Sequence, residues 1–283
     1  GLNLPTKAAD ESGKITVTKS ATKSMTTSDL EKYPYLTEEN LQKGRYAKVN
    51  LNVSAKGYTF ENETMSKLDI VLVFDSSSSM SKTLTIEDEN GNEVTTTRMA
   101  AAKAAATDFA ETLMDDSGNV EIAIVEFGSS TGNVLDFTSN STEVTNFIST
   151  NLSAMTGDNG GTNIHAGLVR ADSILDGGRE DAKKVIIILT DGVPTFYNYV
   201  SGNTTYICGD GQQDEATSNG NYFGNNRTCP NDIAPSDAAK TKLDSMKSEY
   251  TTADVYPIAF ADANAATSLS KINPESTEDT EKI

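Results

Sequence analysis

The sequence predicts an α/β fold in which a doubly wound, mainly parallel sheet is flanked by helices and preceded by an N-terminal β-rich segment. Two observations predict the sheet. From about residue 66 onward, strand-like and helix-like patterns alternate along the chain. Two of these strands, at 70–74 and 185–189, contain only apolar residues, which is typical of parallel strands that are covered on both faces.

The elements of this part follow from their hydrophobic periodicity and their flanking residues. The expected strands cover residues 69–74, 120–127, 133–138, 185–189 and 254–260, and the expected helices cover residues 98–114, 162–176 and 236–250. We expect 133–138 to be a short antiparallel edge strand. Ser236 is the expected N-cap of the last helix, and Pro257 makes the last strand less suited to the sheet interior.

The N-terminal part has a different pattern. Apolar and polar residues alternate near residues 15–17 and 47–56, as in the half-buried strands of an antiparallel sheet. We therefore divide the chain into a β-rich leader at 1–65, part of an incomplete β-sandwich, and an α/β domain at 66–283. That domain carries two insertions, a hairpin at 82–97 that turns at Asn90-Gly91 and a long polar segment at 195–235.

Composition excludes several classes of function. The 283 residues carry a formal net charge of −18. Such a chain lacks the basic face that nonspecific nucleic-acid binding requires, and it is not attracted to an anionic membrane surface. No apolar run reaches the roughly 20 residues that span a bilayer, so we expect no membrane insertion in this segment.

The two cysteines, Cys208 and Cys229, lie in one polar, Gly- and Asn-rich stretch. A disulfide between them would close a loop of about 20 residues and stabilise the fold by roughly 3 kcal/mol. We expect this disulfide, which implies an oxidising, extracytoplasmic setting; the alternative is two free thiols in a mobile loop.

Polar side chains follow the two apolar strands at the points where those strands end. In a doubly wound sheet these strands become neighbours at the switch point, and their carboxyl-end loops line one crevice. The loop before the helix at 162 leads into the same crevice. The residues brought together there are Asp75, Ser77, Ser79, Thr162 and Asp191.

This set supplies three hydroxyls and two carboxylates. Hard oxygen ligands suit Mg²⁺, with Mn²⁺ or Ca²⁺ as alternatives, rather than Zn²⁺ or Cu²⁺. Because few of the ligands are charged, the cation would keep waters and could accept a carboxylate from outside. The sole histidine, His165, is expected to be a packed or capping residue and not a ligand.

These residues carry a family resemblance. DIVLVFDSSSSMS, the Thr in GGTNIHAGL and the Asp in IIILTDGVPT resemble the metal-ion-dependent adhesion site of von Willebrand factor A domains. The resemblance implies that Ser77, Ser79 and Thr162 bind the cation directly, that the two aspartates act largely through water, and that an acidic side chain of a partner fills the open position. The sequence departs from the common bacterial pattern at Ser78, where Gly is usual; if that position needs a positive φ, Ser is strained there.

The flanking segments sharpen the resemblance. A β-rich leader and two insertions beside the site are similar to the tip and surface adhesins of Gram-positive pili. This implies an extracellular, cell-wall-anchored or pilus protein that binds an extracellular-matrix or host-surface protein through an acidic side chain, and possible contacts with other pilin subunits. The main alternative is a structural pilus or surface-layer module whose metal site only stabilises loops. An A domain of a eukaryotic extracellular protein is a further alternative.

An enzyme is not expected. Gly128–Gly132 fits the G-x-S-x-G pattern of hydrolases, but a second strand follows it where that motif requires a strand-to-helix elbow. Phosphate-binding glycines are missing after the first strand, which argues against a nucleotide site.

Overall fold

The computed structural model describes residues 15–22, 48–55, 67–87, 93–115, 117–216, 229–230, 232–259 and 263–274. The chain divides into two compact units. One unit contains residues 1–66, 85–96 and 277–283, and the other contains 67–84 and 97–276.

In the first unit, β1 (Ile15–Thr22) pairs with β2 (Lys48–Ala55) in an antiparallel two-stranded sheet. Both strands lie where the alternation of apolar and polar residues predicts them. The expected hairpin is present as β4 (Thr83–Glu87) and β5 (Glu93–Thr97), which pair with each other. Its predicted turn at Asn90-Gly91 lies outside the described residues.

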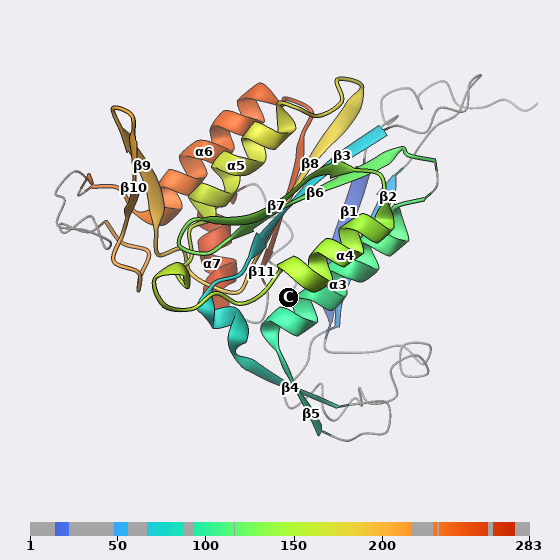
Figure 1. Ribbon diagram of the computed structural model, residues 1–283, viewed down its shortest axis with the longest axis horizontal. Helices are drawn as coiled ribbons and strands as arrows, with labels where there is room; N and C mark the ends of the chain where they lie inside the picture. Colours follow the sequence, from blue (N-terminus) through green and yellow to red (C-terminus); the bar gives the residue numbers. More distant parts are fainter. Residues whose placement is uncertain are drawn as a thin grey trace, which may run out of the picture. The chain divides into compact units, whose positions relative to one another are not determined.

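Within the described residues, the second unit is built on a five-stranded sheet with the order β11-β8-β3-β6-β7 (Figure 1). Its strands are β3 (Lys67–Asp75), β6 (Val120–Phe127), β7 (Thr131–Thr138), β8 (Ala182–Thr190) and β11 (Asp254–Ala259). The pairs β11–β8, β8–β3 and β3–β6 are parallel, and β7 is an antiparallel edge strand beside β6. The predicted doubly wound, mainly parallel sheet is confirmed, with the two apolar strands β3 and β8 as neighbours.

Helices cover both faces of this sheet (Figure 1). On one face lie α3 (Arg98–Leu113) and α4 (Ser141–Asn151), and on the other lie α5 (Ile164–Leu175), α6 (Pro235–Glu249) and α7 (Ala263–Ile272). The first three of these helices each begin after a side-chain cap of the kind that satisfies free backbone amides. The caps are Thr97, Asn140 and Asn163. Neither α4 nor α7 was expected from the sequence patterns.

The core follows the alternation of side chains along the strands. Val71 and Val73 of β3 pack with α5, α6 and α7 in one buried cluster. Ile70 and Leu72 point to the opposite face and are buried as well. A strand that is apolar on both faces is therefore required at the centre of a three-layer domain.

The start of α6 differs from the prediction, whereas Pro257 lies in a strand as predicted. Ser236 is not the N-cap of α6, because the helix begins one residue earlier at Pro235 and has Ala234 at the cap position without a side-chain bond. The backbone amide of Ser236 instead donates to Asp214 Oδ1 at 2.7 Å. Pro257 lies in β11, which among the described strands pairs only with β8, and such an edge position tolerates the missing N–H.

A buried ion cluster joins the amino-terminal ends of β3 and β8, at the far end of the sheet from the predicted site. Asp69 is fully buried and accepts hydrogen bonds from Lys184 Nζ at 2.7 Å and from Arg179 Nε at 2.8 Å. Arg179 also donates to the carbonyl of Leu68. These contacts fix the register of β3 against β8 and therefore the relative positions of their carboxyl ends, where the predicted site lies.

The long insertion after β8 begins with a hairpin of β9 (Tyr197–Ser201) and β10 (Thr204–Cys208). The predicted disulfide is confirmed: Cys208 at the end of β10 is bonded to Cys229, with 5.8 Å between their Cα atoms. We call residues 195–235 the arm. None of the described helices is long and apolar enough to cross a membrane.

Candidate metal site

The loop after β3 places the first three predicted ligands. β3 ends at Asp75, and a short 3₁₀ turn, η2 (Ser78–Ser81), follows at once. The backbone amide of Ser77 donates to Asp75 Oδ1 at 2.7 Å. This bond folds the loop back over the strand end, so that Asp75 and Ser77 face the same side.

Ser78 is accommodated without a left-handed backbone. It opens the 3₁₀ turn, and its amide donates to the carbonyl of Gly160 at 2.8 Å. A 3₁₀ turn uses negative φ angles that any L-residue adopts, so the strain considered for this position does not arise. Glycine is needed instead at position 160, on the loop that faces Ser78. A Cβ on Gly160 would lie 2.9 Å from the Cβ of Ser78.

Hydrogen bonds connect the loop after β3 to the loop after β8. The hydroxyl oxygens of Ser77 and Ser79 lie 2.9 Å apart, and Ser79 Oγ donates to Asp191 Oδ1 at 2.6 Å. Thr190 Oγ1 donates to the second oxygen of Asp75 at 2.5 Å. Side-chain oxygens thus join the loops that follow the carboxyl ends of these two paired strands.

Thr162 reaches the same place from the loop before α5. A Cβ built on Gly192 would lie 3.5 Å from Thr162 Oγ1 and 3.6 Å from Ser79 Oγ, so both hydroxyls face the space beside this glycine. Four of the five predicted residues, Asp75, Ser77, Thr162 and Asp191, are at most 5% exposed, and Ser79 is half-buried. The structure therefore brings all five predicted residues together.

The carboxyl groups of Asp75 and Asp191 have different electrostatic surroundings. Burial, reinforced by the negative charge of Asp191, raises the pKa of Asp75 to about 6 from its ordinary value of 3.8. Asp191 instead accepts a hydrogen bond from Arg98 Nη1 at 2.8 Å on the oxygen that Ser79 does not use. Arg98 is the first residue of α3, and no sequence pattern connects it with the site.

The donor set fits a hard cation. All five candidate ligands present oxygen, and oxygen ligands are preferred by Mg²⁺, Mn²⁺ and Ca²⁺. In an octahedron with metal–oxygen distances of about 2.1 Å, adjacent oxygens are about 3.0 Å apart, and the hydroxyl oxygens of Ser77 and Ser79 have a similar separation of 2.9 Å. Across the ranges that the structure describes, no three His, Cys, Asp or Glu side chains form a metal-binding group, so a cation here depends on hydroxyls.

The first residues of the arm form hydrogen bonds with the backbone of Thr162. The carbonyl of Thr162 accepts hydrogen bonds from the amides of Thr195 at 2.8 Å and Phe196 at 3.1 Å. The amide of Thr162 donates to Thr195 Oγ1 at 3.1 Å. The first residues of the arm therefore position a candidate metal ligand, which no local sequence pattern indicated.

His165 also connects α5 with the arm. Its Nδ1 accepts a hydrogen bond from the backbone amide of Asn198 at 3.1 Å. Burial, with a smaller contribution from the positive charge of Lys242, lowers the pKa of His165 to about 4. His165 is neutral at pH 7 and has the packing role that the sequence predicted.

The G-x-S-x-G segment is a turn between two strands. Residues 128–130 join β6 to β7, so the strand-to-helix elbow of a hydrolase nucleophile is missing. Ser129 is buried, and its hydroxyl accepts a hydrogen bond from the amide of Gly161 at 2.9 Å. Ser129 therefore holds the loop before α5 in place.

Comparisons with known proteins agree with this fold. Residues 70–193 match the family profile described as von Willebrand factor type A domain. The strand order and the matched segment define the second unit as von Willebrand factor A-like. No curated protein sequence shows significant similarity to the chain.

Several solved structures are similar. The vWF domain of the type V pili tip protein Mfa5 from Porphyromonas gingivalis is 18% identical with a TM-score of 0.51, over 74% of this chain and 87% of that chain. The PilB minor pilin from Streptococcus sanguinis is 16% identical with a TM-score of 0.50, over 80% of this chain and 62% of that chain. The pilus adhesin SpaC from Lactobacillus rhamnosus GG is 20% identical with a TM-score of 0.49, over 80% of this chain and 29% of that chain. At these identities the likeness concerns the fold.

Proposed function

We propose that this chain is a metal-dependent adhesion module of a bacterial surface protein or pilus. A divalent cation, Mg²⁺ in the first place, is held by Ser77, Ser79 and Thr162, with Asp75 and Asp191 acting through bound water. The cation supplies an open coordination position that accepts a carboxylate from an extracellular-matrix or host-surface protein. The chain's own residues hold the cation and keep its other positions filled.

One observation carries this proposal: three hydroxyls and two carboxylates from three separate loops converge at the carboxyl ends of β3 and β8. A site with only two carboxylates, one of them paired with Arg98, leaves a bound divalent cation with unbalanced positive charge. Such a cation attracts a further anionic ligand. A partner's carboxylate meets this need.

The setting of the proposed module follows from the disulfide. Bonds such as Cys208–Cys229 persist in oxidising, extracytoplasmic compartments. Similar folds occur in a pili tip protein, a minor pilin and a pilus adhesin. We therefore place the chain on the cell surface, anchored to the wall or carried in a pilus of a Gram-positive bacterium, where other pilin subunits are additional partners.

A structural module is the second candidate. Burial favours it, because four of the five candidate ligands are at most 5% exposed. In that case the metal holds the three loops together and no partner reaches it. The two functions can be distinguished experimentally. Adhesion requires a carboxylate on a partner protein, whereas the structural role requires only the metal.

The test is a surface-binding assay with fibronectin and collagen, each in native form and with its carboxyl groups amidated. We expect the chain to bind at least one native surface in Mg²⁺, to lose binding in EDTA, and to lose it on the amidated surface. Equal binding in EDTA and Mg²⁺ would exclude metal-dependent adhesion to these surfaces. A Mg²⁺-dependent rise in melting temperature without binding to either surface would favour the structural module.

A further inference from the structure

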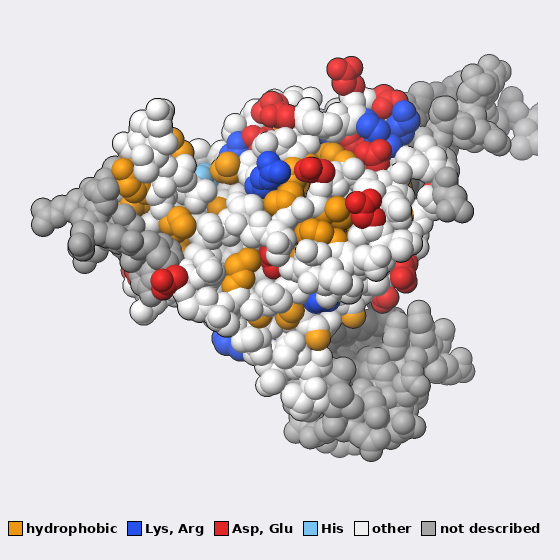
Figure 2. All heavy atoms as spheres, in the orientation of Figure 1, with side chains coloured by type: hydrophobic (Ala, Val, Ile, Leu, Met, Phe, Trp, Pro, Cys, Tyr) orange, Lys and Arg blue, Asp and Glu red, His pale blue; other side chains and the backbone are white. Residues whose placement is uncertain are grey.

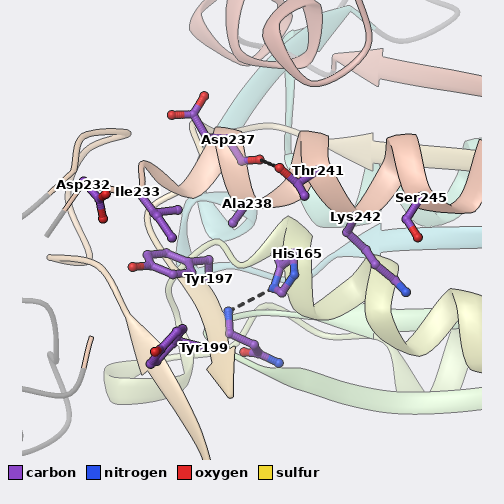
Figure 3. A pocket seen from close by; sticks show the side chains of 11 residues that line it. His165, Tyr197, Tyr199, Asp232, Ile233, Asp237, Ala238, Thr241, Lys242 and Ser245 are labelled. Atoms are coloured by element: carbon purple, nitrogen blue, oxygen red, sulfur yellow. Dashed lines mark hydrogen bonds between the residues drawn. The ribbon is translucent and has the colours of Figure 1, made fainter. Parts of the chain in front are cut away.

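A cavity lies between the arm and the helices α5 and α6 (Figure 3). Its volume is about 400 Å³, within the range of pockets that bind small molecules or single side chains. It contains none of the five candidate metal ligands. Its lining comes from β9, the end of the arm, and one side of α6, with His165 of α5 between them.

Two tyrosines form the wall on the side of the arm. Tyr197 and Tyr199 are two residues apart on β9, so their rings are on the same face of the strand. The hydroxyl of Tyr197 donates to the carbonyl of Pro230 at 3.2 Å, which ties this ring to the far end of the arm. Ile233 lies beside the tyrosines and completes an apolar wall (Figure 3).

The charges around the cavity leave a negative excess near the rings. Lys242 points away from the tyrosines in Figure 3 and is paired with Asp172. His165 is neutral at pH 7 because burial lowers its pKa to about 4. Asp232 is exposed, lies beside Tyr197 and Ile233 in Figure 3, and forms no ion pair with another described residue. Its charge contributes, after burial, to raising the pKa of Tyr197 to about 12.

We propose that this cavity is a second binding site that takes an arginine side chain of a protein partner. The guanidinium stacks on the partly exposed ring of Tyr199 and donates hydrogen bonds to the carboxylate of Asp232, and the ring of Tyr197, which is only 3% exposed, supports this wall from behind. A planar guanidinium suits this arrangement better than an ammonium, because it combines stacking on an aromatic face with a fork of N–H donors. The apolar stem of the side chain packs against Ile233.

The charge of the whole chain supports a basic partner. The sequence has a net charge of −18, and on the face seen in Figure 2 acidic and basic side chains are interspersed without one large basic patch. Charge complementarity of this kind selects partners and speeds their encounter. The site requires no metal, so it extends the proposed function without depending on it.

The experiment is an NMR titration of the full chain in EDTA with three short peptides. They have the sequence Gly-Gly-X-Gly-Gly with blocked ends, where X is arginine, lysine or citrulline, the neutral analogue of arginine. We expect the arginine peptide to shift the ring signals of Tyr197 and Tyr199 saturably. The citrulline peptide should bind about threefold to tenfold more weakly, the range expected for the loss of a cation–π contact and an ion pair.

Variants separate the site from general electrostatics. Asp232→Asn should reduce arginine affinity to the level of citrulline, and Tyr199→Leu, which keeps an apolar wall, should weaken it too. The matched control is Asp237→Asn: this carboxylate belongs to a cavity-lining residue but points away from the rings in Figure 3, so affinity should be unchanged.

Three results would overturn the proposal. They are equal affinity for the arginine and citrulline peptides, an equal loss in the Asp237→Asn and Asp232→Asn variants, and lysine binding as tight as arginine binding. Because EDTA is present throughout, failure here is distinguishable from failure of the metal-dependent adhesion proposed above.

Discussion

Asp191 has two different partners at the centre of the candidate site. One carboxylate oxygen accepts a hydrogen bond from Ser79 at 2.6 Å, and the other accepts one from Arg98 at 2.8 Å. The guanidinium thus offsets part of the negative charge that would attract a cation. We infer that Arg98 limits metal affinity and in return keeps the bound cation electrophilic toward a partner's carboxylate.

Replacing Arg98 tests this role. Arg98→Gln should strengthen Mg²⁺ binding by roughly tenfold, because a positive charge a few ångströms from the cation is removed. Isothermal titration calorimetry of both proteins measures the change, and circular dichroism checks that the variant is folded. Weaker binding in the variant would instead mean that Arg98 mainly orients Asp191.

His165 gives a pH-dependent prediction at a single residue. Its pKa is lowered to about 4 in the folded chain from an ordinary 6.5. Its contribution to stability is therefore complete above pH 6.5 and is lost as the pH falls from 6.5 toward 4. Because it is the sole histidine, its ring signals in an NMR titration are unambiguous, and we expect a midpoint near pH 4. A midpoint near 6.5 would show that the contact with Asn198 does not require neutral imidazole.

Sequence patterns indicated the candidate residues Asp75 and Asp191 because their positions are set by strand ends. Asp75 and Asp191 follow strands that are recognisable from composition alone, and neighbouring parallel strands bring such ends together. Arg98 and Thr195 could not be found in the same way. Arg98 reaches Asp191 only because the hairpin of β4 and β5 returns the chain to the site, and Thr195 acts through backbone bonds that leave no pattern.

At the scale of elements, β3 carries an aspartate at each end with opposite surroundings. Asp75 lies beside hydroxyls and another carboxylate, whereas Asp69 is buried between Arg179 and Lys184. The first arrangement suits an added cation. The second already contains its cations and serves stability.

Asp69→Asn should therefore destabilise the fold without changing metal binding. Removal of one partner from a buried ion cluster costs about 3–5 kcal/mol, because the remaining charges stay buried without compensation. Urea unfolding monitored by circular dichroism measures the loss. Exposed Asp181→Asn, which removes the partner of Lys67 at the surface, is the matched control and should change stability far less, because surface ion pairs contribute little. Equal losses in the two variants would contradict the role of the cluster.

We expect the arm to affect metal binding through Thr195 and not through its disulfide. Thr195→Val removes the hydroxyl that accepts the hydrogen bond from the amide of Thr162, so we expect weaker Mg²⁺ binding by a few-fold, since one hydrogen bond contributes about 1 kcal/mol. Replacing both Cys208 and Cys229 by serine should lower stability by roughly 3 kcal/mol and leave Mg²⁺ affinity unchanged. Isothermal titration calorimetry measures the Mg²⁺ affinity of both variants. A greater loss of Mg²⁺ affinity in the cysteine variant than in Thr195→Val would contradict the role given to Thr195.

Among the elements, the apolar strands β3 and β8 were predicted, whereas the helices α4 and α7 were not. β3 and β8 are apolar throughout, and α5 has a broad apolar face. α4 buries only Val144 and Ile148, which is too short a pattern to distinguish from a loop. The N-cap of α6 was misplaced because Ser236 looks like a cap, whereas Pro235 is already the first helical residue, a position that proline favours.

At the scale of the whole molecule, the second unit has a stabilising ion cluster at one end of its sheet and the candidate recognition site at the other end. The amino-terminal ends of the strands hold the buried ion cluster, and the carboxyl ends hold the candidate metal site. The arm continues from the carboxyl end of β8 and adds the cavity lined by Tyr197 and Tyr199. A partner that contributes both a carboxylate and an arginine would meet two complementary sites on this unit.

The central claim is that the five convergent residues hold a divalent cation, three directly through hydroxyls and two through bound water. The measurement that tests it most directly is calorimetric titration of Mg²⁺ into the wild-type chain, into Asp191→Ala, and into Asp136→Ala. Asp136 is a control aspartate on β7 whose side chain is 83% exposed. We predict one bound ion per chain for wild type and Asp136→Ala and none for Asp191→Ala, with unchanged circular dichroism. Equal binding by all three proteins, or no binding by wild type at millimolar Mg²⁺, would contradict the account.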